Sequence, residues 1–364
     1  MMKMKKTAYI FVAAVLALAA CTKEEALVIQ QVPSPGNELR DAQYYENLRA
    51  WKKTDHVLTY VYYAAYAPLE GSSNLYKEYS SMSDRFIALP DSLDIVNLWM
   101  GIPTADSTLV YKYDPAGVNS AKYNYSPYAA ADMKYCQEVK GTRFVMHADA
   151  SHDWTFTRED GTEFSVLAGG EEELRHYANF ILEQMNNGGL DGVDIDYEPN
   201  DYRWTGKINR LVEMLSESIG PASAHPEKLL IVDYYGGYPS NEIEPLLSYL
   251  VRQAYGGIGY RNLGNSSYPA SKLIICEQWN DSRQASGSRG DGYPTVRGYN
   301  GETLMTWYDG VYQNMGSLEA YARFCMDENA KGYGAYYIDS DFFFAKGPYY
   351  NLRRCIQIAN PSIR

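Results

Sequence analysis

Three acidic residues, Asp194, Asp196 and Glu198, stand at alternate positions within the string DGVDIDYE. Side chains of a β-strand alternate between its two faces, so a strand here directs all three carboxylates to the same side. Crowded carboxylates do not all stay ionised, because their pKa values separate and at least one of them is raised. A protonated acid beside an ionised one is the pairing that acid–base catalysis uses.

Two other interpretations of the acidic segment are a solvated edge strand and a calcium site. A calcium loop places its ligands on a turn with a central glycine, whereas this segment is strand-like throughout. It follows Gly188-Gly189-Leu190 and ends at Pro199, as a strand inside a barrel would. The histidines and cysteines show no spacing typical of zinc ligands, so we expect no metal and no cofactor.

The string DGVDIDYE resembles the D-G-x-D-x-D-x-E motif of glycoside hydrolase family 18, with every defining position filled. The resemblance implies hydrolysis assisted by the substrate, an exception to the usual two-carboxylate scheme. In that chemistry Glu198 would protonate the glycosidic oxygen, and Asp196 would orient the attacking 2-acetamido group. Asp194 would share a proton with Asp196. The substrate is therefore expected to carry an N-acetyl group on the cleaved sugar.

A second resemblance lies in Gln253-Ala254-Tyr255, which is similar to the Q-x-Y pair of endo-β-N-acetylglucosaminidases in that family. It implies that Tyr255 donates its phenol to the acetamido oxygen or to the oxazolinium intermediate, and that Gln253 hydrogen-bonds the same sugar. The family often closes its subsite with a tryptophan on the eighth strand, where this sequence has Tyr336-Tyr337 instead.

Other polar and aromatic residues at strand ends could line a substrate cleft. The candidate substrate-binding residues beyond the two motif pairs are Asp191, Tyr63, Tyr235, Tyr337 and Trp279. Asp233 and Glu277 are weaker candidates for the same lining. His147 is either a structural residue or a sugar contact.

The acidic segment is one of several strand-like runs that alternate with helical patterns. The runs are Val57–Tyr63, Asp94–Met100, Arg143–Asp149, Leu190–Tyr197, Leu229–Tyr235, Tyr249–Tyr255, Leu273–Gln278 and Gly332–Asp339. Eight such strands close a (β/α)8 TIM barrel, an α/β fold whose site lies at the C-terminal ends of the strands. An apolar stripe at helical spacing predicts a helix over Glu171–Asn187.

The predicted barrel occupies residues 51–364 as a single domain. Two long segments, 103–140 and 280–302, read as irregular and would follow the second and seventh strands. In a barrel those positions lie on the rim of the active site, so we expect these loops to govern substrate preference.

The first twenty residues read as a signal peptide, with Lys3, Lys5 and Lys6 before a short apolar run. The string Leu18-Ala19-Ala20-Cys21 resembles a bacterial lipobox, which implies lipidation of Cys21 after cleavage. Residues 21–50 are then a tether between a membrane and the barrel. We expect a lipid-anchored protein of the bacterial outer membrane, on the cell surface, beside other proteins of a surface glycan-uptake system.

Composition agrees with a protein that binds polar ligands. A formal charge of −12 argues against a nucleic-acid partner, because phosphate binding needs clustered Lys and Arg. The 35 Tyr far exceed the 10 Phe and 6 Trp, and so most of the aromatic rings carry a hydroxyl. Four cysteines after Cys21 are widely spaced, which predicts buried thiols or at most one or two bridges.

Three functions fit these observations. The first is an endo-β-N-acetylglucosaminidase that cleaves between the two core N-acetylglucosamines of N-glycans, so that its partner is an N-glycan or glycoprotein. The second is a chitinase or another N-acetylglucosaminidase of the same family. The third is a surface glycan-binding protein on a barrel that has lost catalysis, since fold alone does not decide function. The presence of both Asp196 and Glu198 favours an enzyme.

Overall fold

The computed structural model describes residues 40–68, 77–113, 123–264, 267–279, 293–308 and 310–361. The chain divides into residues 1–38 and a compact unit of residues 39–364. The predicted signal peptide, Cys21 and most of the predicted tether lie outside the described residues. Among the residues that are described, every helix falls short of the length and apolar character needed to cross a membrane.

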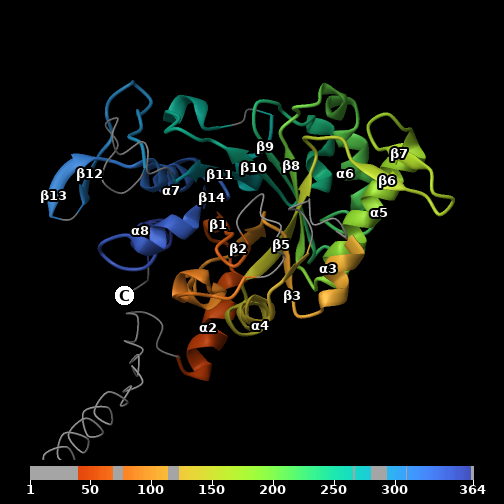
Figure 1. Cartoon of the computed structure of the whole chain (residues 1–364). Coiled ribbons are helices and arrows are strands. Elements are labelled where there is room, and N and C mark those ends of the chain that lie inside the picture. The colour runs from red at the N-terminus through yellow and green to blue at the C-terminus, as the bar shows by residue number, and fades with distance from the viewer. Residues whose placement is uncertain are drawn as a thin grey trace, which may run out of the picture. The chain divides into compact units, whose positions relative to one another are not determined.

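The compact unit is built around a closed barrel of parallel strands (Figure 1). Its strands, in chain order, are β1 Leu58–Tyr62, β2 Ile95–Leu98, β5 Arg143–Asp149, β8 Gly192–Tyr197, β9 Leu229–Tyr234, β10 Tyr249–Gln253, β11 Leu273–Gln278 and β14 Gly332–Tyr336. Each of the eight predicted runs contains one of these strands, and their order around the barrel follows the chain. The predicted TIM-barrel fold is confirmed.

Each barrel strand has one face toward the barrel interior and one toward the surrounding helices. The lower interior is apolar and is filled by residues such as Leu58, Ile95, Val145 and Ile274. β14 contributes no side chain there, because its inward positions are Gly332 and Gly334. A Cβ on Gly334 would lie 2.0 Å from the carbonyl oxygen of Tyr60, so only glycine fits this close approach.

Helices surround the barrel. They are α2 Ala42–Lys52, α3 Ser107–Tyr113, α4 Pro127–Tyr135, α5 Glu171–Asn187, α6 Ile208–Ser216, α7 Ser317–Glu328 and α8 Tyr350–Ala359. The predicted helix over 171–187 is confirmed residue for residue. The connection from β9 to β10 holds only a 3-10 helix, Asn241–Leu246, which contains Pro245. Proline removes a backbone donor and clashes with the preceding turn, so an α-helix does not form there.

The segment 103–140 is not irregular as predicted. Its described part contains α3, α4 and the short parallel pair β3 Ile102–Thr104 and β4 Tyr123–Tyr125. After α4 the chain continues in a π-helical turn, Cys136–Lys140. Two short antiparallel hairpins complete the fold: β6 Thr155–Thr157 with β7 Glu163–Ser165, and β12 Met305–Tyr308 with β13 Val311–Asn314. Residues 280–292 of the other predicted loop lie outside the description.

The predicted tether of residues 21–50 extends too far, because residues 42–50 belong to α2. The helix begins after Asp41, whose carboxylate accepts a hydrogen bond from the Tyr44 amide at 2.7 Å, as a helix N-cap does. Arg49 and Lys52 then bind backbone carbonyls of Val139 and Leu93 in the barrel unit. The barrel domain therefore begins near residue 40 rather than at residue 51.

Candidate active site

The acidic strand β8 directs Asp194 into the barrel interior, where its side chain is fully buried. Two donors reach the same carboxylate oxygen across the barrel interior: the Tyr60 hydroxyl of β1 and the Asn97 amide of β2, the latter at 2.9 Å. The other oxygen has no hydrogen-bond donor among the described residues. Burial raises the pKa of Asp194 to about 6, although the Tyr60 hydrogen bond and the charge of His147 oppose the shift.

Asp196 lies one layer higher, with 19 % of its side chain exposed. His147 Nε2 lies 3.4 Å from its Oδ2, and Gln253 Nε2 donates to its Oδ1 at 3.1 Å. Burial alone would raise the pKa of Asp196, but the hydrogen bond and charge of His147, with hydrogen bonds from Asp233 and Gln253, hold it below its usual range. Asp196 is thus an ionised carboxylate held on several sides.

His147 is the cationic partner of this carboxylate. Burial favours the neutral imidazole, yet the hydrogen bond and charge of Asp196 outweigh burial and raise the pKa of His147. Strand register explains the pairing, since His147 on β5 lies beside Asp194 on β8 and reaches the next inward position. The residue is therefore part of the acid cluster.

Glu198 follows the end of β8, at the C-terminal mouth of the barrel, and is half-buried. Its backbone amide donates to Ser151 Oγ at 3.0 Å, which fixes the chain just beyond the strand. Burial and the charge of Asp196 raise the pKa of Glu198, while a side-chain hydrogen bond from Gln253 lowers it in part. Glu198 therefore holds a proton more readily than an ordinary glutamate, as a general acid must.

A fourth carboxyl group, that of Asp233, lies at the same level of the barrel as Asp196, on the adjacent strand β9. It is fully buried, and the Tyr62 hydroxyl reaches from β1 to donate to its Oδ2. Its Oδ1 has no hydrogen-bond donor among the described residues. Burial and the charges of Asp194 and Asp196 raise the pKa of Asp233 well above its usual range.

Tyrosine rings form one wall of the mouth. Tyr255 is stacked between Tyr235 and Tyr336, with ring centroids 6.1 and 5.9 Å away. Tyr336 and Tyr337 both contact Trp99, which follows β2. Tyr235 and Tyr337 are 54 % and 37 % exposed, so their rings are accessible to a ligand at this rim. The structure thus brings Gln253, Tyr255, Tyr235 and Tyr337 together with the acids.

Two other predicted substrate contacts do not reach the mouth. Tyr63 is fully buried on the helix-facing side, and its hydroxyl donates to the Ser83 carbonyl at 2.5 Å. Trp279 is 5 % exposed and packs in the same outer core, edge-on to Tyr293. Both predictions were wrong because the residue one position earlier is the one that faces the barrel interior: Tyr62 on β1 and Gln278 on β11.

Asp191 lies at the opposite end of the barrel from Glu198. Its Oδ2 accepts hydrogen bonds from the Phe144 amide at 2.9 Å and from Gln137 at 2.8 Å. This carboxylate therefore ties β8 to β5 at the closed end and does not contact substrate. The glycine after it is required for the same packing, because a Cβ on Gly192 would lie 2.3 Å from the Leu229 carbonyl oxygen.

Glu277 was a weaker lining candidate, but it too points away from the mouth. It is fully buried, and its two oxygens accept the amides of Gly256 and Gly257 at 2.8 Å each. These glycines directly follow Tyr255, so Glu277 fixes the loop that holds this tyrosine. It positions the site without touching the cleft.

Sequence reasoning missed Tyr60, Tyr62, Asn97 and Trp99 as members of the site, and it ranked Asp233 too low. Strand phase was the available signal. Once Asp194 and Asp196 are inward, neighbouring strands in a barrel place residues of matching register inward too. On β1 the run LTYVYY has large side chains on both faces, and sequence alone does not reveal which tyrosines turn inward.

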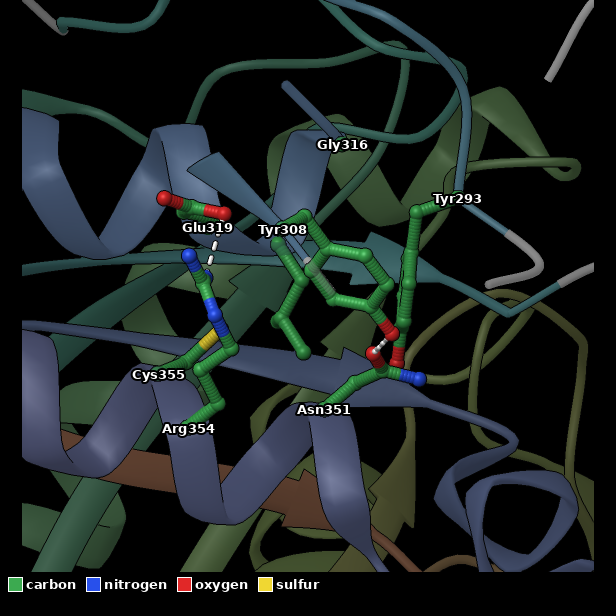
Figure 2. A pocket seen from close by; sticks show the side chains of 8 residues that line it. Tyr293, Tyr308, Gly316, Glu319, Asn351, Arg354 and Cys355 are labelled. Atoms are coloured by element: carbon green, nitrogen blue, oxygen red, sulfur yellow. Dashed lines mark hydrogen bonds and ion pairs between the residues drawn. The ribbon is translucent and has the colours of Figure 1, made fainter. Parts of the chain in front are cut away.

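Outside the mouth, a small cavity lies between α7, α8 and the β12–β13 hairpin (Figure 2). Its polar groups bind one another: Tyr308 donates to Asn351 Oδ1 at 2.7 Å, and Arg354 pairs with Glu319. In the described part of the chain, no group of side chains is arranged to hold a metal ion. The four cysteines after Cys21 are buried, and none of them is in a disulfide bond.

The cluster can separate an acid from an anion within one small space. Gln253 donates to Asp196 and also hydrogen-bonds Glu198, so one amide lies between the two carboxyl groups. His147 keeps Asp196 ionised, whereas burial and the charge of Asp196 raise the pKa of Glu198. Paired titratable groups with opposite shifts are the arrangement expected of an acid and its electrostatic partner.

Comparison with known proteins places this barrel among enzymes that act on glycans. The family model of the endo-β-N-acetylglucosaminidase EndoS TIM-barrel domain matches residues 44–336. No curated protein matches the chain significantly.

Solved structures share the fold at low identity. BT1044, in a variant with glutamine replacing a glutamate, is 21 % identical with a TM-score of 0.59, covering 90 % of this chain and 97 % of that one. The apo endo-β-N-acetylglucosaminidase from Cordyceps militaris is 19 % identical with a TM-score of 0.56, covering 90 % and 98 %. A mutant of that enzyme, in complex with fucosyl-N-acetylglucosamine-Asn, gives 18 % and 0.57, with 90 % and 98 % covered. The family match spans most of the barrel and includes all four acids of the cluster, so the chain belongs to the EndoS-type endo-β-N-acetylglucosaminidase TIM-barrel family and is a glycoside hydrolase.

Proposed function

We propose that the enzyme is an endo-β-N-acetylglucosaminidase that hydrolyses the β-1,4 bond of the N,N'-diacetylchitobiose core of N-glycans. One observation carries the proposal: Gln253 donates to Asp196 at 3.1 Å at the mouth where Glu198 and Tyr255 also lie, with the pKa of Asp196 lowered and that of Glu198 raised. Such a site fits a sugar that brings its own acetamido group to the reaction. The ligand of the Cordyceps militaris structure, fucosyl-N-acetylglucosamine-Asn, agrees with an N-glycan substrate.

The reaction follows from the roles of the two acids. Glu198 gives its proton to the glycosidic oxygen as the bond to the anomeric carbon breaks. The carbonyl oxygen of the acetamido group bonds to that carbon, and the N–H of the resulting oxazolinium ion faces the Asp196 anion. Ionised Glu198 then takes a proton from water, which attacks the same carbon, reopens the ring and retains the anomeric configuration.

Product masses test the proposal. High-mannose, hybrid and complex glycoproteins and chitin oligomers are incubated separately with the enzyme. The proposal expects protein that retains one N-acetylglucosamine per glycosylation site. Cleavage of chitin oligomers alone would instead select a chitinase. Glycan binding without cleavage of any substrate would select a non-catalytic binding protein.

Substrate assistance has a separate test in the acetamido group. Replacing the N-acetyl group of the cleaved sugar by N-trifluoroacetyl makes the carbonyl oxygen a weaker nucleophile. The rate constant kcat is expected to fall by at least about tenfold, because the acetamido oxygen attacks in the transition state. An unchanged kcat with a rate-limiting chemical step would exclude attack by this oxygen.

We also propose that the enzyme is a lipoprotein anchored through Cys21 in the bacterial outer membrane. The support is the order of a basic start, an apolar run and the string Leu18-Ala19-Ala20-Cys21. Metabolic labelling with a radioactive fatty acid should mark the full-length chain and not a Cys21→Ala variant. Equal labelling of both chains would exclude this anchor.

A further inference from the structure

Asp233 is the one member of the acid layer that stands outside the DGVDIDYE string. It lies on β9 in register with Asp196, its side chain is fully buried, and Tyr62 donates to its Oδ2. Nothing in the reaction described above requires a third acid beside Asp196 and Glu198. Burying another carboxyl group so close to an anion destabilises the fold unless that group has a specific partner.

The contacts of Asp233 decide where a proton must reside. Its Oδ1 is buried and has no N–H or hydroxyl donor among the described residues. Its neighbour across the strand pair is Asp196, which lies in direct register on β8. A buried carboxyl oxygen without a donor, beside the Asp196 anion, is favoured in its protonated form. Asp196 already receives Gln253 and His147, so the proton belongs to Asp233.

We propose that Asp233 is a permanently neutral acid that donates a hydrogen bond to Asp196 and so holds Asp196 ionised and aligned toward the substrate's acetamido group. Tyr62 fixes the Asp233 carboxyl group through Oδ2, which leaves Oδ1 to carry the proton. Asp233 is then a positioning residue that acts through Asp196. This inference rests on the proposed function for its kinetic test.

Other titratable groups on several barrel strands interact with this pair. They are Asp194 on β8, Tyr60 and Tyr62 on β1, His147 on β5, Tyr255 just after β10 and Cys276 on β11. Only His147 among them can add a positive charge, and it is engaged by Asp196. Their combined effect favours a neutral Asp233, because each nearby anion opposes its ionisation.

The test compares two substitutions of nearly equal size. Asp233→Asn keeps an acceptor for Tyr62 and an N–H donor for Asp196, whereas Asp233→Leu removes both. The leucine variant should lose at least about 100-fold in kcat with KM changed less than about threefold. The asparagine variant should recover kcat to within about fivefold of wild type. Melting temperatures of both variants identify any loss that comes from unfolding.

The pH profile separates this role from a merely structural one. A neutral Asp233 adds no charge near Glu198, so the pH–rate profile of Asp233→Asn should superimpose on that of wild type. Were Asp233 ionised, its removal would take away a nearby negative charge and lower the pKa of Glu198. The alkaline limb of the profile would then move to lower pH by about one unit, which would overturn the proposal. Inactivity of a folded asparagine variant would overturn it as well.

An infrared difference spectrum of wild type against Asp233→Asn tests the proton without any substrate. The difference at neutral pH should show the carbonyl band of a protonated carboxylic acid, and an ionised carboxylate band would refute the assignment. Wild type that cleaves no glycan would refute the proposed function instead, and the infrared result would still decide the state of Asp233.

Discussion

The Asp196→Asn variant tests the electrostatic core of the site. Asparagine keeps the volume of the side chain and can still accept from Gln253 Nε2, which lies 3.1 Å from Oδ1 in the wild type. The substitution removes one negative charge, and the cation that forms on the substrate then loses its counterion. The variant should therefore fail in the chemical step while the fold and ground-state binding persist.

The size of the effect follows from Coulomb's law. Two unit charges about 4 Å apart interact by roughly 4 kcal/mol at an effective dielectric constant near 20. Loss of this interaction in the transition state corresponds to a factor of about 1,000 in rate. We expect kcat to fall by about 100- to 1,000-fold and KM to change less than about threefold. The lowered pKa of Asp196 means that the folded protein stabilises this anion, so the melting temperature of the variant should fall modestly.

Asp191→Asn is the matched control, because it makes the same chemical change in the same motif at the other end of β8. Asp191 binds the Phe144 amide and Gln137 far from the mouth, so this variant should keep its kcat within about twofold. It should unfold about 1–2 kcal/mol more easily through weakened hydrogen bonds. Steady-state kinetics on a glycoprotein and denaturant unfolding supply both measurements. An Asp196→Asn enzyme that works as fast as the Asp191→Asn enzyme would refute the role given to Asp196.

Three further predictions address the acid, the loop and the distal ion pair. Glu198→Gln should abolish turnover yet bind glycan with an unchanged melting temperature; in wild type, kcat should fall as pH rises through the raised pKa of Glu198, because the proton donor is lost. Glu277 accepts hydrogen bonds from two loop amides, and Glu277→Gln would place an N–H against one of them. The variant should lose about 1–3 kcal/mol of unfolding free energy, and its kcat should fall because Tyr255 is displaced. Denaturant unfolding and steady-state kinetics measure the two effects. Glu319→Gln, which breaks the pair with Arg354 (Figure 2), should lower the free energy of unfolding by about 3 kcal/mol at pH 7 without changing kcat. Ion pairing holds the pKa of Glu319 below its usual range despite burial, so this difference should shrink as pH falls through that lowered pKa; a pH-independent difference would contradict the ion-pair explanation.

The barrel could be predicted because its strands carry a strong signal. Strands covered on both faces read as continuous apolar runs, and the eight runs alternate with amphipathic patterns. Because the apolar runs are continuous, they do not reveal which side chains of a strand face the barrel interior and which face the helices. On β1 and β11, large side chains occupy both faces, so Tyr63 and Trp279 were placed in the mouth although they lie in the outer core. On β8, by contrast, the alternation of acidic and apolar residues shows which side chains face the barrel interior.

The segment 103–140 misled for a different reason. It contains three prolines and three serines, which are typical of loops, and α4 lacks a clear apolar stripe. Tertiary contacts supply what local sequence does not. The Tyr123 hydroxyl, for example, donates to the Gln184 carbonyl at 2.6 Å and ties β4 to α5. The hydrophobic periodicity of the sequence does not predict helices and strands that depend on such contacts.

The protein itself compensates much of the negative charge in the acid cluster. Asp194 is met by Tyr60 and Asn97, and Asp196 by His147, Gln253 and Asp233. The protein thus compensates the two deeper acids before any ligand arrives. Glu198 differs from them: it is half-buried at the mouth, and burial and the charge of Asp196 raise its pKa. Because its hydrogen-bond partners already hold Asp196 in place, its carboxylate need not reorganise when positive charge develops beside it. The raised pKa of Glu198 suits it to donate a proton to the leaving group.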